Sequence, residues 1–114
     1  MANYSGTTSL DLVFSSLADP TRRAVLVRLG QTRELTISEL AAPLAIQMPT
    51  VLKHLGVLDR AGLITRTKTG RTVSVRADAS GTKPALDWLT RQEQFWNSSL
   101  DRLVDLVEKA EDRN

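Results

Sequence analysis

The segment IQMPTVLKHLG, residues 46–56, carries the side chains with the most evident chemistry. As a helix that buries one narrow stripe, it presents polar and small residues near its start. Gln47 has the donor and acceptor pair that recognises adenine, and Lys53 can reach guanine or a phosphate. Such a face is typical of a helix that enters the major groove of duplex DNA. The positions predicted to face outward are Gln47, Met48, Pro49, Thr50, Leu52, Lys53 and Gly56.

Two further cations lie in the sequence Lys68-Thr69-Gly70-Arg71. The flanking residues 63–66 and 72–76 are rich in β-branched side chains, which predicts a β-hairpin with Gly70 in its turn. This hairpin, over about residues 63–76, brings Lys68 and Arg71 to its tip. Two cations beside a glycine suit a phosphate or a narrow minor groove.

The charge of the chain is unevenly distributed. The formal net charge is only +2, from 15 basic and 13 acidic residues. Residues 20–76, however, carry ten basic and three acidic residues, whereas residues 1–19 and 77–114 are both acidic overall. This asymmetry favours a polyanionic partner for the middle of the chain, although charge runs are also common on solvated surfaces.

Two short helices are expected in the first 30 residues. The first begins after Thr8 or Ser9, and the second begins at Pro20 behind Asp19, a good N-cap residue. Gly30 is expected to end the second helix. The apolar stripes at helical spacing are Leu10, Val13, Phe14 and Leu17 in the first helix and Ala24, Val25, Leu26 and Leu29 in the second.

A helix-turn-helix is predicted over about residues 36–61. Thr36 and Glu39 form a capping box that opens a short helix, and Pro43 limits its length. A second helix begins near Pro49, ends before Gly62 and packs the stripe Val51, Leu55 and Leu58. The residues expected to fix the angle between the two helices are Ala41, Leu44, Ile46, Val51 and Leu55.

A long helix is predicted from about residue 84 to 111, because residues 85–111 contain neither glycine nor proline. A chain of 114 residues cannot bury the apolar face of this helix by itself, which favours pairing with a second copy. The expected fold is therefore a single domain, residues 1–114, mainly α with one small β-hairpin. The apolar face comprises Leu86, Leu89, Trp96, Leu100, Leu103, Val104 and Val107, with Trp88 and Phe95 to the side.

Several motifs occur in a characteristic order: SLADPTRRAVLVRL, then ISELA, then PTVLKHLGVLDRAGLI, then a hairpin that contains Gly and Arg. Over about residues 17–75 the chain thereby resembles the ArsR-type winged-helix repressors of bacteria. The resemblance implies a winged helix-turn-helix and a homodimer whose recognition helices occupy successive major grooves of a near-palindromic operator. It also implies repression of the protein's own or an adjacent operon, with release of DNA when an effector binds.

The resemblance implies that the first and last helices form the dimer interface. The residues assigned to it are Leu10, Phe14, Trp96, Leu100, Leu103 and Val107.

The chain departs from the family pattern Val-Ser-x-His-Leu at Leu52, where a hydroxyl that faces DNA is replaced by an apolar side chain. Leu52 either touches a thymine methyl group or makes no contact. His54, which matches the histidine of this pattern, is interpreted as a packing or phosphate-contacting residue. Arg22 and Arg23 either reach the DNA backbone or pair with acidic neighbours, and Arg22 is counted among the candidate DNA contacts.

No metal or other cofactor is expected. The chain has no cysteine and one histidine, whereas a transition-metal site needs at least two nitrogen or sulfur ligands. Metal sensing, known in this family, is therefore not expected. Trp88, Phe95 and Trp96 either line a small apolar effector pocket or belong to the core or dimer seam.

Enzymatic activity is not expected, because no nucleophile has an evident base and no glycine-rich phosphate loop is present. The absence of cysteine is compatible with the cytoplasm, and no signal peptide or apolar span predicts a membrane location. The alternative to a DNA-binding regulator is a winged-helix module that binds another protein through the same surface.

Overall fold

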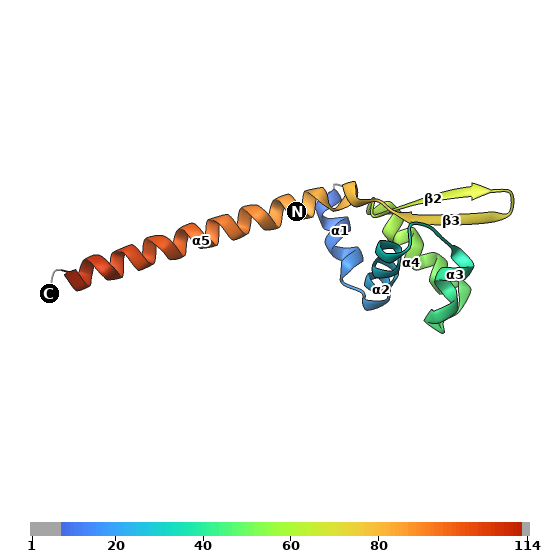
Figure 1. The fold of residues 1–114 in the computed structure, drawn as a ribbon, viewed down its shortest axis with the longest axis horizontal. Coiled ribbons are helices and arrows are strands. Elements are labelled where there is room, and N and C mark those ends of the chain that lie inside the picture. The colour runs from blue at the N-terminus through green and yellow to red at the C-terminus, as the bar shows by residue number, and fades with distance from the viewer. Residues whose placement is uncertain (1–7, 113–114) are drawn as a thin grey trace, which may run out of the picture. The chain divides into compact units, whose positions relative to one another are not determined.

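The computed structural model describes residues 8–112, which are mainly helical and include a small antiparallel sheet (Figure 1). This confirms the predicted fold class. The described residues form two compact units that divide between Pro84 and Ala85. The helices are α1 (Ser9–Leu17), α2 (Pro20–Gln31), α3 (Ile37–Ala41), α4 (Met48–Arg60) and α5 (Lys83–Asp112); the strands are β1 (Leu35–Thr36), β2 (Ile64–Thr69) and β3 (Thr72–Ala77). Two 3-10 turns, η2 (Ala42–Leu44) and η3 (Ala79–Thr82), complete the order.

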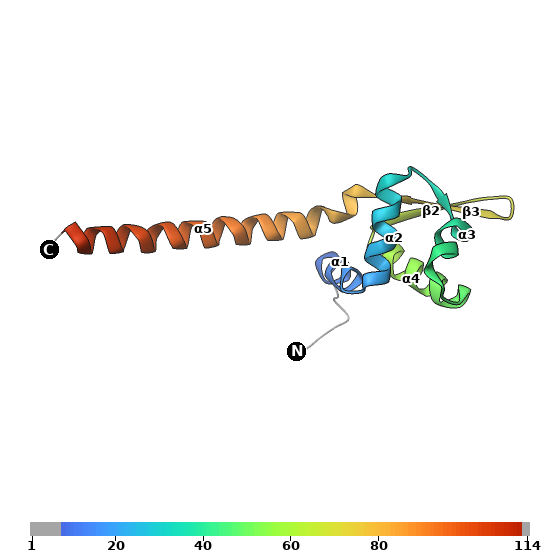
Figure 2. The same cartoon turned by 60° about the horizontal axis from the view of Figure 1, so that its bottom comes forward.

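The core of the first unit lies where α1, α2 and α4 pack on one another and on the base of the sheet (Figure 2). Val51, Leu55 and Leu58 of α4 are buried, as their spacing predicts. Two expected core residues are exposed: Ala24, and Ile46, which is 38% exposed in the turn before α4. Three others, Leu26, Ala41 and Leu44, are half-buried. The fully buried hydrophobic side chains are Val13, Val25, Leu40, Val51, Leu55, Leu58, Leu63 and Val75.

Side-chain caps begin the helices of this unit. Thr8 caps α1 in a reciprocal box with Asp11, so Thr8 rather than Ser9 is the N-cap. Thr36 and Glu39 form the predicted box at the start of α3. The backbone N–H of Thr36 donates to the Glu39 carboxylate at 2.8 Å. This hydrogen bond, followed by one with the Thr36 hydroxyl, lowers the pKa of the Glu39 carboxyl. Local sequence therefore sets where α3 begins.

The sheet has the order β1–β3–β2, with all neighbours antiparallel. The hairpin is confirmed, but its strands are longer than expected: β2 reaches Thr69, so only Gly70 and Arg71 form the turn. Gly70 adopts the left-handed conformation, with φ +62°. Ile64 at the base is buried, whereas the following residues of β2 are all exposed. The hairpin is therefore anchored at its base, and its distal half meets solvent.

Gly30 does not end α2, contrary to expectation. The helix continues to Gln31, and Thr32 donates its backbone N–H to the carbonyl of Arg28. Gly30 has no atom within 4 Å of a Cβ added to it. Gly81, in contrast, lies against the backbone of Gly62, where an added Cβ would stand 1.8 Å from the carbonyl oxygen.

These two glycines predict opposite effects of alanine. Gly81→Ala is expected to destabilise the protein by about 1–3 kcal/mol, because the backbone at Gly62 must move. Gly30→Ala is expected to stabilise it by about 0.5–1 kcal/mol, because it adds helix propensity at no steric cost. Urea unfolding measures both values. A destabilising Gly30→Ala would contradict the observed end of α2.

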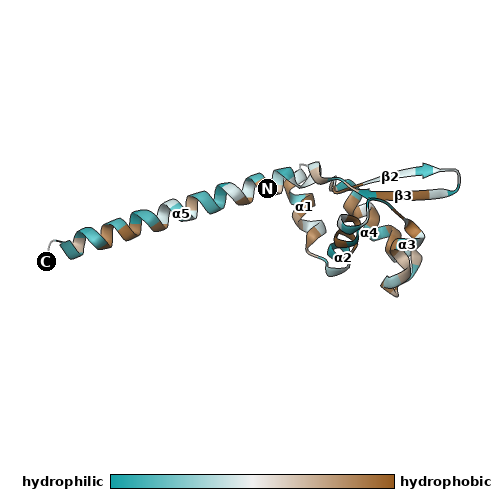
Figure 3. Cartoon of the chain, viewed as in Figure 1, coloured by the Kyte–Doolittle hydropathy of each residue, from teal (hydrophilic) through white to brown (hydrophobic). Residues whose placement is uncertain are grey.

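Helix α5 is 30 residues long and amphipathic, and bands of apolar residues recur along it (Figure 3). This confirms the predicted long C-terminal helix. Ala85 is its buried residue among those described. No helix within residues 8–112 combines the length and the apolar character that a membrane crossing needs.

Candidate functional site

The start of α4 presents the residues that the sequence singled out. The N-cap is Gln47, whose side chain makes no capping hydrogen bond and is exposed. Because Val51, Leu55 and Leu58 anchor the opposite side of α4, the orientation of the exposed face is fixed. The exposed residues from the predicted set are Gln47, Met48, Pro49, Thr50, Leu52 and Lys53. Gly56 was also expected to face outward, but it is half-buried, close to the Arg60 guanidinium.

The turn between α3 and α4 contains one unusual backbone conformation. Ala45, which follows η2, is left-handed with φ 55°. A residue other than glycine rarely adopts this conformation, so the surrounding packing must hold it. Leu40 before the turn and Val51 after it are both buried, so the core holds the chain on either side of the turn. The α3–turn–α4 segment is thus a helix-turn-helix with a defined angle.

The hairpin presents its cations to solvent. Lys68 is exposed and pairs with Val73 in the last part of the ladder, and exposed Arg71 lies in the turn. An open hollow of about 320 Å³ lies between this turn and the start of α3. Its lining comprises Thr36, Ile37, Ser38, Arg71, Thr72 and Val73. Arg71 therefore lines the same hollow as the start of α3.

An ion pair ties the hairpin to α4. Arg66 donates from Nε at 3.0 Å and from Nη2 at 2.6 Å to the same oxygen of Asp59. Both side chains are about a third or more exposed, so the solvent-screened pair orients the hairpin more than it stabilises the fold. Sequence reasoning missed this contact, although its i, i+7 spacing spans the turn from α4 into β2.

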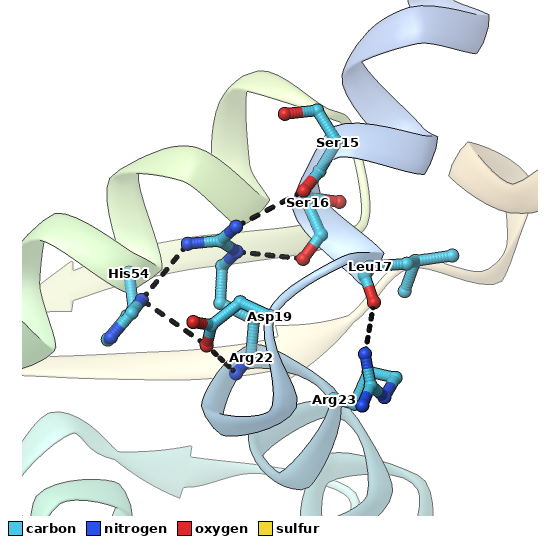
Figure 4. Close-up of polar contacts among 7 residues, drawn as sticks. All are labelled: Ser15, Ser16, Leu17, Asp19, Arg22, Arg23 and His54. Carbon is cyan, nitrogen blue, oxygen red and sulfur yellow. Dashed lines mark hydrogen bonds and ion pairs between the residues drawn. The ribbon is translucent and has the colours of Figure 1, made fainter.

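Arg22 and Arg23 point to the end of α1 (Figure 4). Arg22 donates to the carbonyls of Ser16 at 2.7 Å and Ser15 at 3.1 Å, and its Nη1 lies 3.2 Å from His54 Nδ1. Arg23 donates to the carbonyl of Leu17 at 2.6 Å. Within residues 8–112 neither guanidinium donates to a carboxylate, and the Arg22 guanidinium makes all its recorded hydrogen bonds within the protein.

Asp19 completes this cluster as the N-cap of α2. Its Oδ2 accepts the backbone N–H of Arg22 at 3.0 Å and lies 3.9 Å from His54 Nδ1. The backbone hydrogen bond from Arg22 is the main cause that holds the pKa of the Asp19 carboxyl below its ordinary value of 3.8. The ionised Asp19 carboxylate therefore stabilises the folded protein fully at pH values above its ordinary pKa. This stabilisation is lost as the pH falls through the lowered pKa.

The residues assigned to self-association are accessible. On α1, Leu10 is half-buried and Phe14 is 37% exposed. On α5, the four assigned residues, Trp96, Leu100, Leu103 and Val107, are each more than half exposed. Trp88 and Phe95 lie to the side of this stripe, also exposed. Among residues 8–112 no three acidic, histidine or cysteine side chains are grouped to hold a metal ion.

Comparison with known proteins agrees with this geometry. The sequence model of a family described as a helix-turn-helix domain matches residues 17–67. The HTH-type transcriptional regulator Rv2034 of Mycobacterium tuberculosis is 32% identical over 104 residues, which cover 91% of this chain and 94% of the relative. The arsenical resistance operon repressor of Escherichia coli is 33% identical over 64 residues, 56% of this chain and 55% of that protein.

The fold has close counterparts among solved structures. The crystal structure of an ArsR family transcriptional regulator superimposes with a TM-score of 0.75 and 38% sequence identity. The match covers 86% of this chain and 98% of the other. The likeness therefore extends beyond the helix-turn-helix to nearly the whole of that regulator.

Proposed function

The chain belongs to the ArsR family of helix-turn-helix, DNA-binding transcriptional regulators, and from this premise we propose that it acts as a homodimeric, sequence-specific repressor. Its operator is a near-palindrome, and its target is its own or an adjacent operon. The repressor role is supported by the similarity to one named repressor, the arsenical resistance operon repressor of Escherichia coli. The site of action is the cytoplasm, where its partner is double-stranded DNA.

The observation that carries the proposal is the exposed face at the start of α4. Gln47, Thr50 and Lys53 are all exposed on a helix whose other side is locked into the core. In a helix-turn-helix, the N-terminal residues of the second helix read base edges in the major groove. Gln47 is the adenine reader in this proposal, and Lys53 contacts guanine or a phosphate. Met48, Pro49 and Leu52 supply apolar contacts, for which thymine methyl groups are the partners.

The hairpin of β2 and β3 is the wing of the winged helix, and it supplies contacts that do not depend on the DNA sequence. Lys68 and Arg71 are exposed at the distal end of the hairpin, and Asp59 holds the base of the hairpin to α4 through Arg66. Contacts to phosphate position a protein on the duplex, whereas contacts to bases select the sequence. The wing therefore raises affinity for all duplexes, while α4 chooses among them.

Dimerisation sets the form of the operator. Two copies related by a two-fold axis place two α4 helices on half-sites about 34–36 Å apart, or a multiple of that distance. The exposed apolar stripe of α5 and the accessible residues of α1 form the interface in this proposal. A small-molecule effector that releases DNA is part of the family's mode of action, and the absence of cysteine excludes thiolate metal sensing as its chemistry.

Selection of duplexes from a random pool, near physiological salt, tests the proposal directly. The parent protein is expected to enrich a near-palindromic sequence. Gln47→Ala is expected to relax the preference at one base position in each half-site, at a cost of about 1–3 kcal/mol against the parental sequence. Gln31→Ala, at the exposed end of α2, is the matched control and should enrich the parental sequence. Enrichment of no duplex at any salt concentration would favour a protein-binding module instead.

A further inference from the structure

The guanidinium of Arg22 connects three helices (Figure 4). Arg22 lies in the first turn of α2, donates to the two carbonyls Ser15 and Ser16 at the end of α1, and meets His54 of α4 at 3.2 Å. The pair spans 32 positions of sequence. One side chain thus fixes the end of α1 against the middle of the helix that carries the DNA-reading face.

The contact also defines the tautomer of the neutral His54 ring. An arginine side chain has donors and no acceptor, so Nδ1 of His54 must accept and carries no proton. A neutral imidazole then keeps its proton on Nε2. Asp19 does not compete for Nδ1, because its Oδ2 is 3.9 Å away, beyond hydrogen-bond distance. Figure 4 shows the other ring nitrogen directed away from Arg22 and Asp19.

His54 occupies the flank of the reading face. It lies one turn after exposed Thr50 on the same side of α4, next to exposed Lys53, and its side chain is 16% exposed. When the face of a recognition helix enters the major groove, its flanks meet the sugar-phosphate backbone. An N–H donor at this place suits a phosphate oxygen.

We propose that Arg22 is a positioning residue that holds His54 as a neutral Nε2–H donor to a DNA phosphate. The proposal rests on the DNA-binding function proposed above. Arg22 stays inside the protein, and a neutral His54 displaces no counterion. The pair therefore contributes to affinity without contributing to its salt dependence, unlike cations that touch phosphates directly.

Nitrogen-15 NMR of the free protein tests the first half of the proposal without DNA. His54 is the only histidine of the chain, so both imidazole nitrogen signals are assigned at once. In the parent, at a pH where the ring is neutral, the proton is expected on Nε2 alone. Arg22→Ala is expected to shift both signals toward a mixture of tautomers. A proton on Nδ1 of the neutral parental ring, or identical spectra for the two proteins, would overturn the link.

Titration of a duplex enriched by the parent from a random pool tests the second half. Arg22→Ala is expected to bind this duplex about tenfold more weakly, as for the loss of one hydrogen bond to a charged group. The slope of log affinity against log salt should stay at the parental value. Arg23→Ala is the matched control, because Arg23 also donates to the end of α1 but is bonded there to Leu17. A slope reduced by about 0.9 for Arg22→Ala would show a direct phosphate contact and overturn the proposal, as would an equal loss in Arg23→Ala.

His54→Asn keeps the proposal testable if Arg22→Ala does not fold. An asparagine oxygen reaches about as far as Nδ1 and can accept from Arg22, but nothing replaces the Nε2 donor. This variant is expected to keep the parental thermal midpoint and to lose about tenfold in duplex affinity. Parental binding by His54→Asn would overturn the proposal. A parent that enriches no duplex would instead refute the DNA-binding function, and the NMR result would still decide the Arg22–His54 link.

Discussion

Replacement of both Lys68 and Arg71 with alanine is expected to weaken binding to every duplex about thirtyfold at about 0.15 M salt. Each lost phosphate contact lowers the slope of log affinity against log salt by about 0.9, which at this salt corresponds to about fivefold in affinity. The two residues are exposed at the distal end of the hairpin, so their removal leaves the core intact. The total slope should therefore fall by about 1.8, while the preferred sequence stays the same.

Titration of an enriched duplex and a scrambled duplex over a series of salt concentrations measures both quantities. A double variant of α5, Arg102→Ala with Lys109→Ala, removes the same charge from exposed positions opposite the apolar stripe. It is expected to keep nearly the parental slope, because those side chains take no part in the proposed DNA surface. Equal slopes for the hairpin variant and the parent would show that the hairpin does not touch phosphates.

The caps and turns of this protein follow from neighbouring residues and are therefore predictable from sequence. The capping box of Thr36 with Glu39, the Asp19 cap before Pro20 and the left-handed Gly70 each involve residues within four positions of one another. Their chemistry is complete before any tertiary contact forms. The stripe of Val51, Leu55 and Leu58 is equally local in origin, and it fixes which face of α4 is exposed.

The contacts that sequence reasoning missed depend on how separate elements meet. Nothing around Arg22 indicates that His54 is its partner, since the contact arises only when α2 packs against α4. The two-residue strand β1 exists because Leu35 meets Val75 of β3. Glycine is common at helix ends, which is why Gly30 was expected to end α2. The backbone N–H of Thr32 still donates to the Arg28 carbonyl, so the residue type alone gave the wrong boundary.

The residues of the candidate site also fall into two groups: those that local sequence predicts and those whose place depends on how separate elements pack. The exposed start of α4 could be predicted, because apolar residues at helical spacing bury one side of the helix and leave the other side exposed. Gly56 was wrongly expected to face outward. It lies at the edge of the exposed face, near Arg60, and helical periodicity does not resolve that edge. Arg22 was counted among the candidate DNA contacts because it is a cation in a basic segment, and its contacts with α1 and α4 were not foreseen. Its three acceptors are two main-chain carbonyls and one ring nitrogen, none of which appears in a pattern of side-chain types.

Leu103→Glu is expected to convert the protein from a dimer to a monomer and to abolish operator binding at nanomolar concentrations. Leu103 is 57% exposed on the apolar stripe of α5, which also carries Leu100 and Val107. In a two-fold interface the substitution occurs twice. Each copy loses the burial of a leucine and must desolvate a carboxylate, about 3 kcal/mol in total, so the dimer is weakened by about 6 kcal/mol. That corresponds to about four orders of magnitude in its dissociation constant.

Sedimentation equilibrium at micromolar concentration distinguishes the two states, and Ser98→Glu is the matched control on the opposite side of α5. The control should remain dimeric, because its carboxylate stays in water. The monomer should still unfold cooperatively, since the buried residues Val13, Leu55 and Val75 all belong to the unit that ends at Pro84. If operator binding is lost while that unit stays folded, the variant is defective in dimerisation, because one α4 helix can read only one half-site. A Leu103→Glu protein that sediments as a dimer would remove α5 from the interface.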